Sequence, residues 1–376
     1  MHSSSISPPA LSLSRRIRQT PYEKRVLEHA PKSMTVYNNT PLATVFHSPQ
    51  EDYEHLCEYV QLWDVSCQRQ VEIVGPAALE LIELITPRDI SKCQIGQCMY
   101  IPLVDEYGGI INDPILLRTN KKRFWLSTAD SNVMLWVKGI AYGMDYEVSI
   151  CDPDVNPLAI QGPKSDDLMA NLLGEGIREL PFFRFVRSEL AGTSFYIARS
   201  GWSGQGGFEI YLEEHWKGLD LWDCIWEAGQ IYDIRAGCPN SIDRIERGLI
   251  SYGNDITADE NPYECGLDRF FPKDKDAHCM SVDALDLIRK QGVTHQLVHL
   301  LIPGEPLSPP RDVWHLSDDS GYVCGFLTSI AYSIRFGGNI AFALMETMYS
   351  NPGQSLYVDN GTEELIKAMV ISELKD

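Results

Sequence analysis

The stretch Arg199-Ser-Gly-Trp-Ser-Gly-Gln-Gly-Gly-Phe-Glu-Ile-Tyr-Leu212 joins a glycine-rich segment to an apolar run that carries one acid and one phenol. Glycine lets the backbone turn tightly or approach a ligand closely. The last five residues predict a β-strand, in which alternation places the apolar side chains on one face and Glu209 and Tyr211 on the other. The stretch therefore predicts either a ligand site beside a bare loop or a glycine-rich hairpin whose Glu-Tyr face is solvated.

Composition limits the class of protein. The chain has 376 residues, 44% hydrophobic and 22% charged, which indicates a globular protein of two or three domains. Its 52 acidic and 32 basic residues give a net charge of −20, which argues against a nucleic-acid partner and is compatible with a cationic substrate. No apolar run approaches the roughly 18 residues of a membrane span, so no membrane partner is expected.

Cysteine and histidine spacing bears on metals and on the cellular compartment. Ten cysteines are scattered through the chain without a Cys-x-x-Cys pair, and the histidines show no metal-binding pattern. We therefore expect no metal. Scattered cysteines favour a reducing cytoplasm. The protein is expected to be a monomer or a homodimer.

Two segments share one pattern, in which a short apolar strand meets a Gly-Pro junction and an amphipathic helix. The two copies are 71–85, with Gly75-Pro76 at the junction, and 157–173, with Gly162-Pro163. Each is followed by strands and then by a Gly-Gly that opens a strand bearing an acid, Asp113 in the first copy and Glu209 in the second. This repetition predicts two related α+β halves, residues 31–155 and 156–280, with a ligand between them and the two acids facing each other. Alternatively, Asp113 belongs to a plain Asn-Asp-Pro turn.

Three further regions have their own character. Residues 237–255 predict a helix that begins near residue 241 and ends at Gly253. Its two arginines, Arg244 and Arg247, either hold a ligand carboxylate or pair with the helix's own acids at the surface.

Residues 281–376 contain short strand-like runs between turns, which predicts an all-β module. Residues 1–30 are poor in apolar side chains and are expected to form a loosely held arm.

Together these motifs resemble the aminomethyltransferase family, which comprises the folate-dependent T-protein of the glycine cleavage system and its relatives. The likeness covers about residues 13 to 350, and within the family it is greatest to the dimethylsulfoniopropionate demethylase branch. The segments that carry this likeness are Tyr37-Asn-Asn, Trp63-Asp-Val, Arg69-Gln-Val-Glu72, Ala198-Arg-Ser-Gly-Trp-Ser203, Gln205-Gly-Gly-Phe-Glu-Ile-Tyr211, Gly237-Cys-Pro-Asn240 and Asn261-Pro-Tyr-Glu-Cys-Gly266.

The resemblance implies an α+β protein with the three-domain clover-leaf of the T-protein. Tetrahydrofolate would lie in a central channel between the two halves, and the C-terminal β-barrel-like module would form the third leaf. The implied reaction moves a methyl group from the sulfonium of dimethylsulfoniopropionate to N5 of tetrahydrofolate. A sulfonium is already an activated methyl donor, so positioning would supply most of the acceleration, without a metal or a nucleophilic side chain.

The resemblance also implies roles for individual residues. On the folate side it implies Glu209, Tyr211 and Asp113, of which Tyr211 and Asp113 are the catalytic candidates. On the side of the onium substrate it implies Trp202, Tyr211, Tyr100 and Ser127. A carboxylate at residue 209 would bond the donor edge of the pterin, and aromatic faces would hold the cation. Ser127 would bond the propionate, while Asp113 would have a positioning role.

Two departures from the branch leave the donor open. Gly204 stands where a lysine is usual, and Ser333-Ile-Arg335 stands where Ser-Pro is usual. The alternative function is a folate-dependent methyl- or aminomethyltransferase that acts on a methylamine or another onium donor. A third hypothesis, from a different class, is a folate-binding protein of the same fold without catalytic activity.

Overall fold

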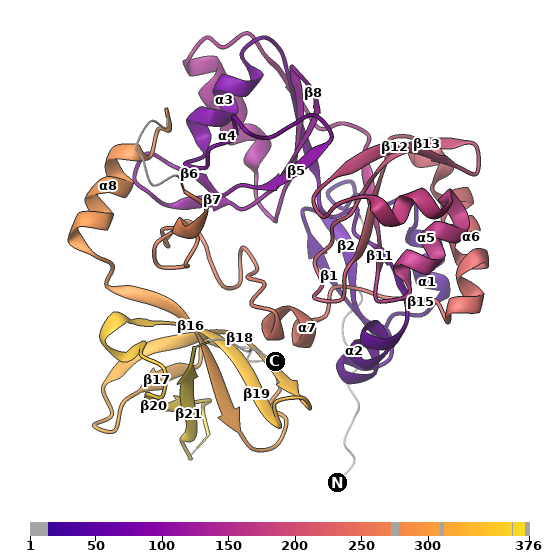
Figure 1. Cartoon of the computed structure of the whole chain (residues 1–376). Helices are drawn as coiled ribbons and strands as arrows, with labels where there is room; N and C mark the ends of the chain where they lie inside the picture. The colour runs from indigo at the N-terminus through magenta and orange to yellow at the C-terminus, as the bar shows by residue number, and fades with distance from the viewer. Residues whose placement is uncertain (1–13, 272–277, 309–311, 363, 373–376) are drawn as a thin grey trace.

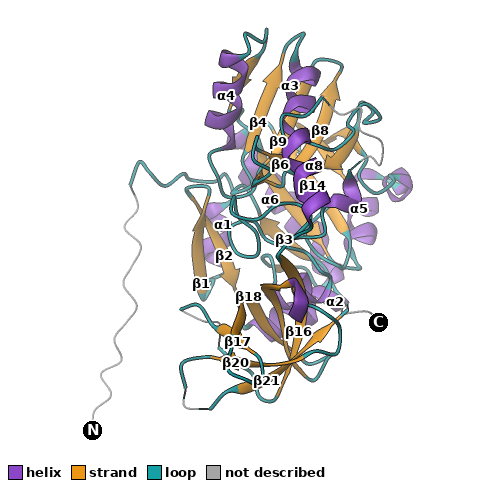
Figure 2. Ribbon diagram, turned by 90° about the vertical axis from the view of Figure 1, so that its left-hand side faces the viewer, coloured by secondary structure: helices purple, strands orange, loops and turns teal. Residues whose placement is uncertain are grey.

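The elements of the protein form three groups arranged around a common centre, as Figure 1 shows. The computed structural model describes residues 14–271, 278–308, 312–362 and 364–372. Figure 2 shows the first group at one end of the molecule and the third group at the other, with elements of the second group between them. The short helix α7 (Ser241–Glu246) lies at the centre of Figure 1.

The first group is a five-stranded antiparallel sheet covered on one face by helices. Its strands are, in spatial order, β10 (Ser149–Cys151), β4 (Gln70–Val74), β9 (Arg123–Ser127), β8 (Ile115–Asn120) and β5 (Gln97–Tyr100). Helices α3 (Ala78–Ile85) and α4 (Val133–Gly143) pack on the face that carries Ile73 and Phe124. Leu81, Ile82 and Ile85 are fully buried, because their spacing places them on one side of α3. A two-stranded sheet of β6 (Leu103–Val104) and β7 (Ile110–Asn112) accompanies this group.

The second group is a six-stranded sheet. Its strands are, in order, β12 (Phe185–Leu190), β13 (Thr193–Ala198), β14 (Gly207–Leu212), β11 (Asn156–Gln161), β3 (Gln61–Asp64) and β15 (Arg235–Ala236). Helices α5 (Ser165–Leu173) and α6 (Gly218–Gly229) pack on one face of the sheet. The strand expected at the end of the opening stretch is β14, and all six of its residues are buried.

The two α+β halves are not contiguous in the chain. Strand β3 lies in the segment 31–155 assigned to the first half, yet it pairs with β11 in the second sheet. The helix α2 (Pro49–Glu58) precedes β3 and is bonded to it, since Gln61 donates to the carbonyl of Asp52 at 2.8 Å. The sequence repeat could not show this, because hydrogen bonding between strands, and not chain order, decides which sheet a strand joins.

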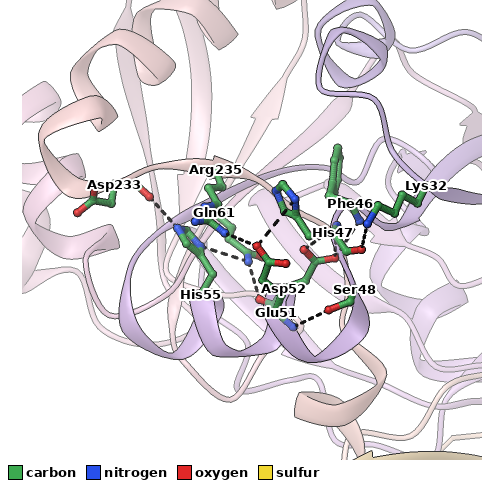
Figure 3. A network of polar contacts seen from close by, with 10 residues as sticks. All are labelled: Lys32, Phe46, His47, Ser48, Glu51, Asp52, His55, Gln61, Asp233 and Arg235. Atoms are coloured by element: carbon green, nitrogen blue, oxygen red, sulfur yellow. Dashed lines mark hydrogen bonds and ion pairs between the residues drawn. The ribbon is translucent and has the colours of Figure 1, made fainter.

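Polar contacts fix helix α2, as Figure 3 shows. Ser48 caps its N-terminus by accepting from the backbone N–H of Glu51 at 3.1 Å. The carboxylate of Asp52 accepts from the backbone N–H groups of Phe46 and His47. At the other end, His55 bonds the carbonyl of Asp233 at 2.8 Å. These contacts place α2 against the second group, where it supports α7.

The segment that begins at residue 14 is held against the second group, whereas residues 1–30 were expected to form a loosely held arm. Residues 1–13 lie outside the described part, but Tyr22 is fully buried and its hydroxyl donates to the carbonyl of Asn156 at 3.2 Å. Helix α1 (Glu23–Glu28) follows, and Arg25 makes two hydrogen bonds of 2.6 Å to Asp223 on α6. The low apolar content of this segment was misleading, because one buried aromatic ring and one bidentate ion pair are enough to anchor it. The sheet of β1 (Ser33–Tyr37) and β2 (Thr40–Val45) follows α1.

The third group is a closed barrel. Its strands are, in order, β16 (His295–Pro303), β19 (Gly338–Glu346), β18 (Val323–Ser333), β17 (His315–Ser317), β20 (Ser355–Asp359) and β21 (Ile366–Ile371). Helix α8 (Val282–Gln291) leads into it. Closure leaves no sheet edge exposed. The expected C-terminal β-barrel-like module is therefore confirmed.

Both Gly-Pro junctions of the repeat have a glycine at positive φ. Gly75 and Gly162 have φ angles of +152° and +118°. At each, a Cβ atom would lie 2.3 Å from a backbone carbonyl oxygen, that of Glu147 for the first and Tyr59 for the second. Both glycines are therefore required by conformation and by close backbone approach.

We expect Gly162→Ala to lower the free energy of unfolding by about 2–4 kcal/mol, because the new methyl group meets rigid backbone in a strained conformation. Gly139→Ala is the matched control, since Gly139 lies within α4 and a Cβ there meets nothing within 4 Å. That control should gain about 0.5–1 kcal/mol from helix propensity. Denaturant unfolding measures both, and equal effects would contradict the assignment.

Candidate functional site

The register of the five-stranded sheet places four residues in one row across four strands. Gln70 pairs with Ser127, Ser127 with Ile115, and Ile115 with Tyr100. Residues directly opposite each other in antiparallel strands share a face of the sheet. Ser127 and Tyr100, two of the residues expected on the substrate side, therefore lie on the same face, together with Gln70.

This face is turned toward the second sheet. Residues two positions along each strand, among them Leu117 and Trp125, point the same way and pack in one cluster with Tyr211 of β14. The ring centroids of Trp125 and Tyr211 are 6.4 Å apart. The face of β14 that carries Glu209 and Tyr211 thus lies between the two sheets. The alternative of a solvated Glu-Tyr face is wrong, because these residues are only 5% and 0% exposed.

Glu209 is a buried carboxylate bonded on one oxygen. Its Oε2 atom accepts hydrogen bonds from the hydroxyls of Ser200 and Tyr211, the latter at 3.2 Å. Among the described residues, none donates to Oε1, which leaves this oxygen to another donor. Burial raises the pKa of Glu209, although the two hydroxyl hydrogen bonds oppose the shift. Burial and the neighbouring carboxylate also raise the pKa of Tyr211 well above its ordinary value.

Asp113 lies beside Tyr100, whose hydroxyl donates to its Oδ2 at 3.0 Å. Burial raises the pKa of Asp113 to about 7, with the hydrogen bond from Tyr100 opposing and the charge of Asp255 adding to the rise. The charge of a second acid, Asp255, thus acts on Asp113. Asp255 closes the segment 237–255 noted in the sequence and was not among the residues expected at the site. The facing of Asp113 and Glu209 stays a prediction.

Helix α7 anchors the glycine-rich loop. The carboxylate of Asp243 accepts from the backbone N–H of Gly204 and from the amide of Gln205, both at 2.8 Å. The guanidinium of Arg244 lies over the ring of Trp202, 5.7 Å from its centroid. Trp202 is half-buried. Among the contacts of the described residues, none joins Trp202 to Tyr211, so the two expected cation-binding rings are not in direct contact.

Three glycines of this loop have close neighbours. A Cβ at Gly201 would lie 2.1 Å from the amide of Gln161, and one at Gly207 would lie 2.1 Å from the carbonyl oxygen of Ile160. A Cβ at Gly204 would lie 2.2 Å from Cγ of Arg247. The stem of Arg247 thus fills the space in which a side chain at residue 204 would begin.

The charged side chains of α7 are buried. Arg244 donates to Asp255 at 2.7 Å, and their side chains are 7% and 0% exposed. The alternative that Arg244 forms a surface pair is therefore wrong. The helix also ends earlier than expected, at Glu246, because Gly248 has a φ of +69° and terminates it before Gly253.

Neither a metal-binding cluster nor a membrane-spanning helix is found among the described residues. Within residues 14–271, 278–308, 312–362 and 364–372, no group of three or more His, Cys, Asp or Glu side chains is placed to hold a metal ion. No helix in the same ranges has the length and apolar character needed to cross a membrane.

The raised pKa of Asp113 predicts a pH dependence of stability. The folded chain keeps this proton up to about pH 7, whereas the carboxyl has an ordinary pKa of 3.8. The contribution of the protonated Asp113 carboxyl to stability is therefore complete below the ordinary pKa, and it is lost as the pH rises toward 7. We expect Asp113→Asn to gain stability relative to the unmodified protein across this interval, measured by urea unfolding at several pH values.

Asp89→Asn serves as the opposite control, because the Ser91 hydroxyl lowers the pKa of Asp89. Removing that carboxyl should lower the free energy of unfolding more at neutral pH than at acidic pH. Parallel stability curves for the Asp113 variant and the unmodified protein would contradict the assignment.

The contact between Gly204 and Arg247 predicts a coupled effect. Gly204→Ala should lower the free energy of unfolding by about 1–3 kcal/mol, because the added methyl group overlaps the Arg247 stem. In an Arg247→Ala background the same change should cost much less. A double-mutant cycle by denaturant unfolding measures the coupling. Gly176→Ala is the control, since a Cβ there meets nothing within 4 Å, and equal costs in both backgrounds would refute the overlap.

Comparison with known proteins places this geometry in a family. The family model described as the GCVT N-terminal domain matches residues 24–275, and that of the glycine cleavage T-protein C-terminal barrel domain matches residues 295–374. The chain is 44% identical over 346 residues to dimethylsulfoniopropionate demethylase DmdA of Ruegeria pomeroyi. The aligned region covers 92% of this chain and 94% of that protein. The chain is 27% identical over 359 residues to an aminomethyltransferase of Caldanaerobacter subterraneus, covering 94% and 92%.

A solved structure shows the same fold. The glycine cleavage system aminomethyltransferase T from Bartonella henselae superposes with a TM-score of 0.83 at 24% identity, over 95% of this chain and 97% of that one. The α+β T-protein fold with its C-terminal barrel is thus confirmed. With both family models matched in order along the sequence, the chain belongs to the glycine cleavage T-protein, or aminomethyltransferase, family.

Proposed function

We propose that this enzyme demethylates dimethylsulfoniopropionate, with tetrahydrofolate as the methyl acceptor. The products are 3-(methylthio)propionate and 5-methyltetrahydrofolate. The observation that carries the proposal is the 44% identity to the demethylase of Ruegeria pomeroyi across 92% of the chain, against 27% to the aminomethyltransferase of Caldanaerobacter subterraneus. The polar face between the two sheets supports it.

On the folate side, the carboxylate of Glu209 fits a ring with N–H donors. It is buried, two hydroxyls fix its Oε2, and no described residue donates to its Oε1. An oxygen without a donor, on a carboxylate that is otherwise buried, favours a ligand that brings a donor. Tetrahydrofolate supplies such donors on its pterin ring and a nucleophilic nitrogen at N5. Glu209 would therefore fix the orientation of the acceptor, with Tyr211 beside it.

On the donor side, rings and one hydroxyl suit a zwitterion with a cationic sulfur. Tyr211, Tyr100 and Trp202 offer aromatic faces, each worth about 0.5–2 kcal/mol to a cation. Arg244 lies over the Trp202 ring, so a second cation would use the opposite face of that indole. Ser127 would donate to the propionate, because a hydroxyl can donate to a carboxylate.

The transfer needs little from acid–base chemistry. The bond between the methyl carbon and sulfur breaks, its electron pair stays on sulfur as a neutral thioether, and the carbon bonds N5. The proton lost from that nitrogen passes to solvent. The protein's contribution is alignment of donor and acceptor. Asp113, held by Tyr100 at 3.0 Å, would position the acceptor and would not need to act as a strong base.

The proposal predicts that Glu209→Gln weakens tetrahydrofolate binding by roughly 10- to 100-fold, the usual effect of losing a hydrogen bond to a charged group. The amide keeps the size of the side chain, and it removes a buried charge that opposes folding, so the variant should remain folded. Glu189→Gln is the matched control, on an exposed position of β12 in the same sheet. Fluorescence titration or calorimetry measures both, and an unchanged affinity in Glu209→Gln would contradict the role of Glu209.

The donor is tested by product analysis. Purified protein mixed with dimethylsulfoniopropionate and tetrahydrofolate should yield 5-methyltetrahydrofolate and 3-(methylthio)propionate in equal amounts. Methylenetetrahydrofolate and ammonia from an aminomethyl donor would instead identify the aminomethyltransferase activity. Folate binding without turnover of any sulfonium or ammonium donor would favour a non-catalytic protein.

The remaining expectations concern the setting of the reaction. All ten cysteines are free, which suits the reducing cytoplasm in which we propose that the enzyme acts. Its oligomeric state, monomer or homodimer, stays a prediction that size-exclusion chromatography with light scattering can test.

A further inference from the structure

We infer that Gln70 is a positioning residue that makes Ser127 a dedicated hydrogen-bond donor to the carboxylate of the methyl donor. The two side chains are neighbours in the cross-strand row of the five-stranded sheet. Gln70 is 1% exposed and Ser127 is 7% exposed. The inference rests on the proposed function, because it concerns how that substrate is recognised.

The orientation of the Gln70 amide is fixed by its partners. Its Nε2 atom lies 2.9 Å from the carbonyl oxygen of Gln68 and 2.9 Å from Oγ of Ser127. A backbone carbonyl can only accept, so the atom that faces it must be the nitrogen, and the flipped amide is ruled out. Both N–H bonds of this amide are therefore used, one on Gln68 and one on Ser127.

This arrangement decides the direction of the Ser127 hydroxyl. Since Ser127 accepts from Gln70, its own proton must turn to another acceptor. No acceptor for it is found among the described residues, so the proton is left for a ligand. A carboxylate is the ligand group that a buried hydroxyl donor recognises best, because hydrogen bonds to charged acceptors are the strong ones.

A second observation also indicates a ligand at this place. Oε1 of Gln70 is buried and has no hydrogen-bond partner among the described residues. A buried acceptor without a donor is rare in folded proteins. The pair thus presents one donor, the Ser127 hydroxyl, and one acceptor, Gln70 Oε1, side by side. The unpartnered Gln70 Oε1 thus marks the same place as a ligand site, at which the Ser127 hydroxyl is the group that contacts the carboxylate.

A double-mutant cycle tests the inference with dimethylsulfoniopropionate as donor. Ser127→Ala should lower kcat/KM by about ten- to a hundredfold, mainly through KM, as expected for a lost hydrogen bond to a charged group. Gln70→Met keeps the length of the side chain but cannot donate, so it should lower kcat/KM in the same direction. The double variant should be no worse than Ser127→Ala within about twofold, because Gln70 acts through Ser127.

Two further measurements separate positioning from general damage. The inhibition constant of 3-(methylthio)propionate, which carries the same carboxylate, should rise in parallel with KM in each variant, whereas the affinity for tetrahydrofolate should not change. Thr128→Val is the matched control, since Thr128 is also buried but bonds the carbonyl of Arg69 at 3.0 Å. It should leave kcat/KM unchanged.

Gln70→Glu gives an independent test if Gln70→Met does not fold. A glutamate cannot donate to Gln68 and would accept the Ser127 proton, which reverses the hydroxyl. Its loss of kcat/KM should equal or exceed that of Ser127→Ala. Losses that multiply in the double variant, a fall in folate affinity, or full activity of either single variant would overturn the inference. Absence of turnover by the unmodified protein would instead reject the proposed function.

Discussion

The arrangement of the three groups depends on three buried charged side chains of the six-residue helix α7. Each of them needs a hydrogen-bond partner. Asp243 bonds the glycine-rich loop, and Arg244 bonds Asp255, whose carboxylate also accepts from Thr328 on the barrel. Glu246 accepts from Tyr53 on α2 at 2.7 Å and from Ser333 on the barrel. Breaking such a buried pair leaves an uncompensated charge, which is strongly destabilising. The helix therefore fixes how the second group, its loop and the barrel lie relative to one another.

The candidate site follows from two sheets that face each other. One contributes a row of polar side chains that includes Ser127 and Tyr100, and the other contributes Glu209 and Tyr211. Each sheet covers its opposite face with helices, so the inner faces are the place where polar groups can be buried and still reach a ligand. Burial also raises the pKa of the acids at residues 113 and 209.

The two positions expected to depart from the demethylase branch have contacts at the end of α7. The missing side chain at Gly204 makes room for the stem of Arg247. In the segment Ser333-Ile-Arg335, Ser333 donates to Glu246, and the guanidinium of Arg335 lies 3.6 Å from the same carboxylate. Both positions therefore lie beside one helix, and no hydrogen bond or ion pair among the described residues joins either of them to Glu209.

The sequence by itself determined the local elements and the family. Strand alternation in residues 208–212, the two Gly-Pro junctions and the turn-separated strands of the barrel are short-range patterns, and they appear in the structure as β14, the paired strand–helix units and the closed barrel. Only the tertiary structure decided which strands share a sheet, as with β3, and which groups meet, as with Arg244 and Asp255 or Gln70 and Ser127. The reason is physical: periodicity reports which face of an element is buried, whereas register and packing between distant segments decide what lies opposite that face.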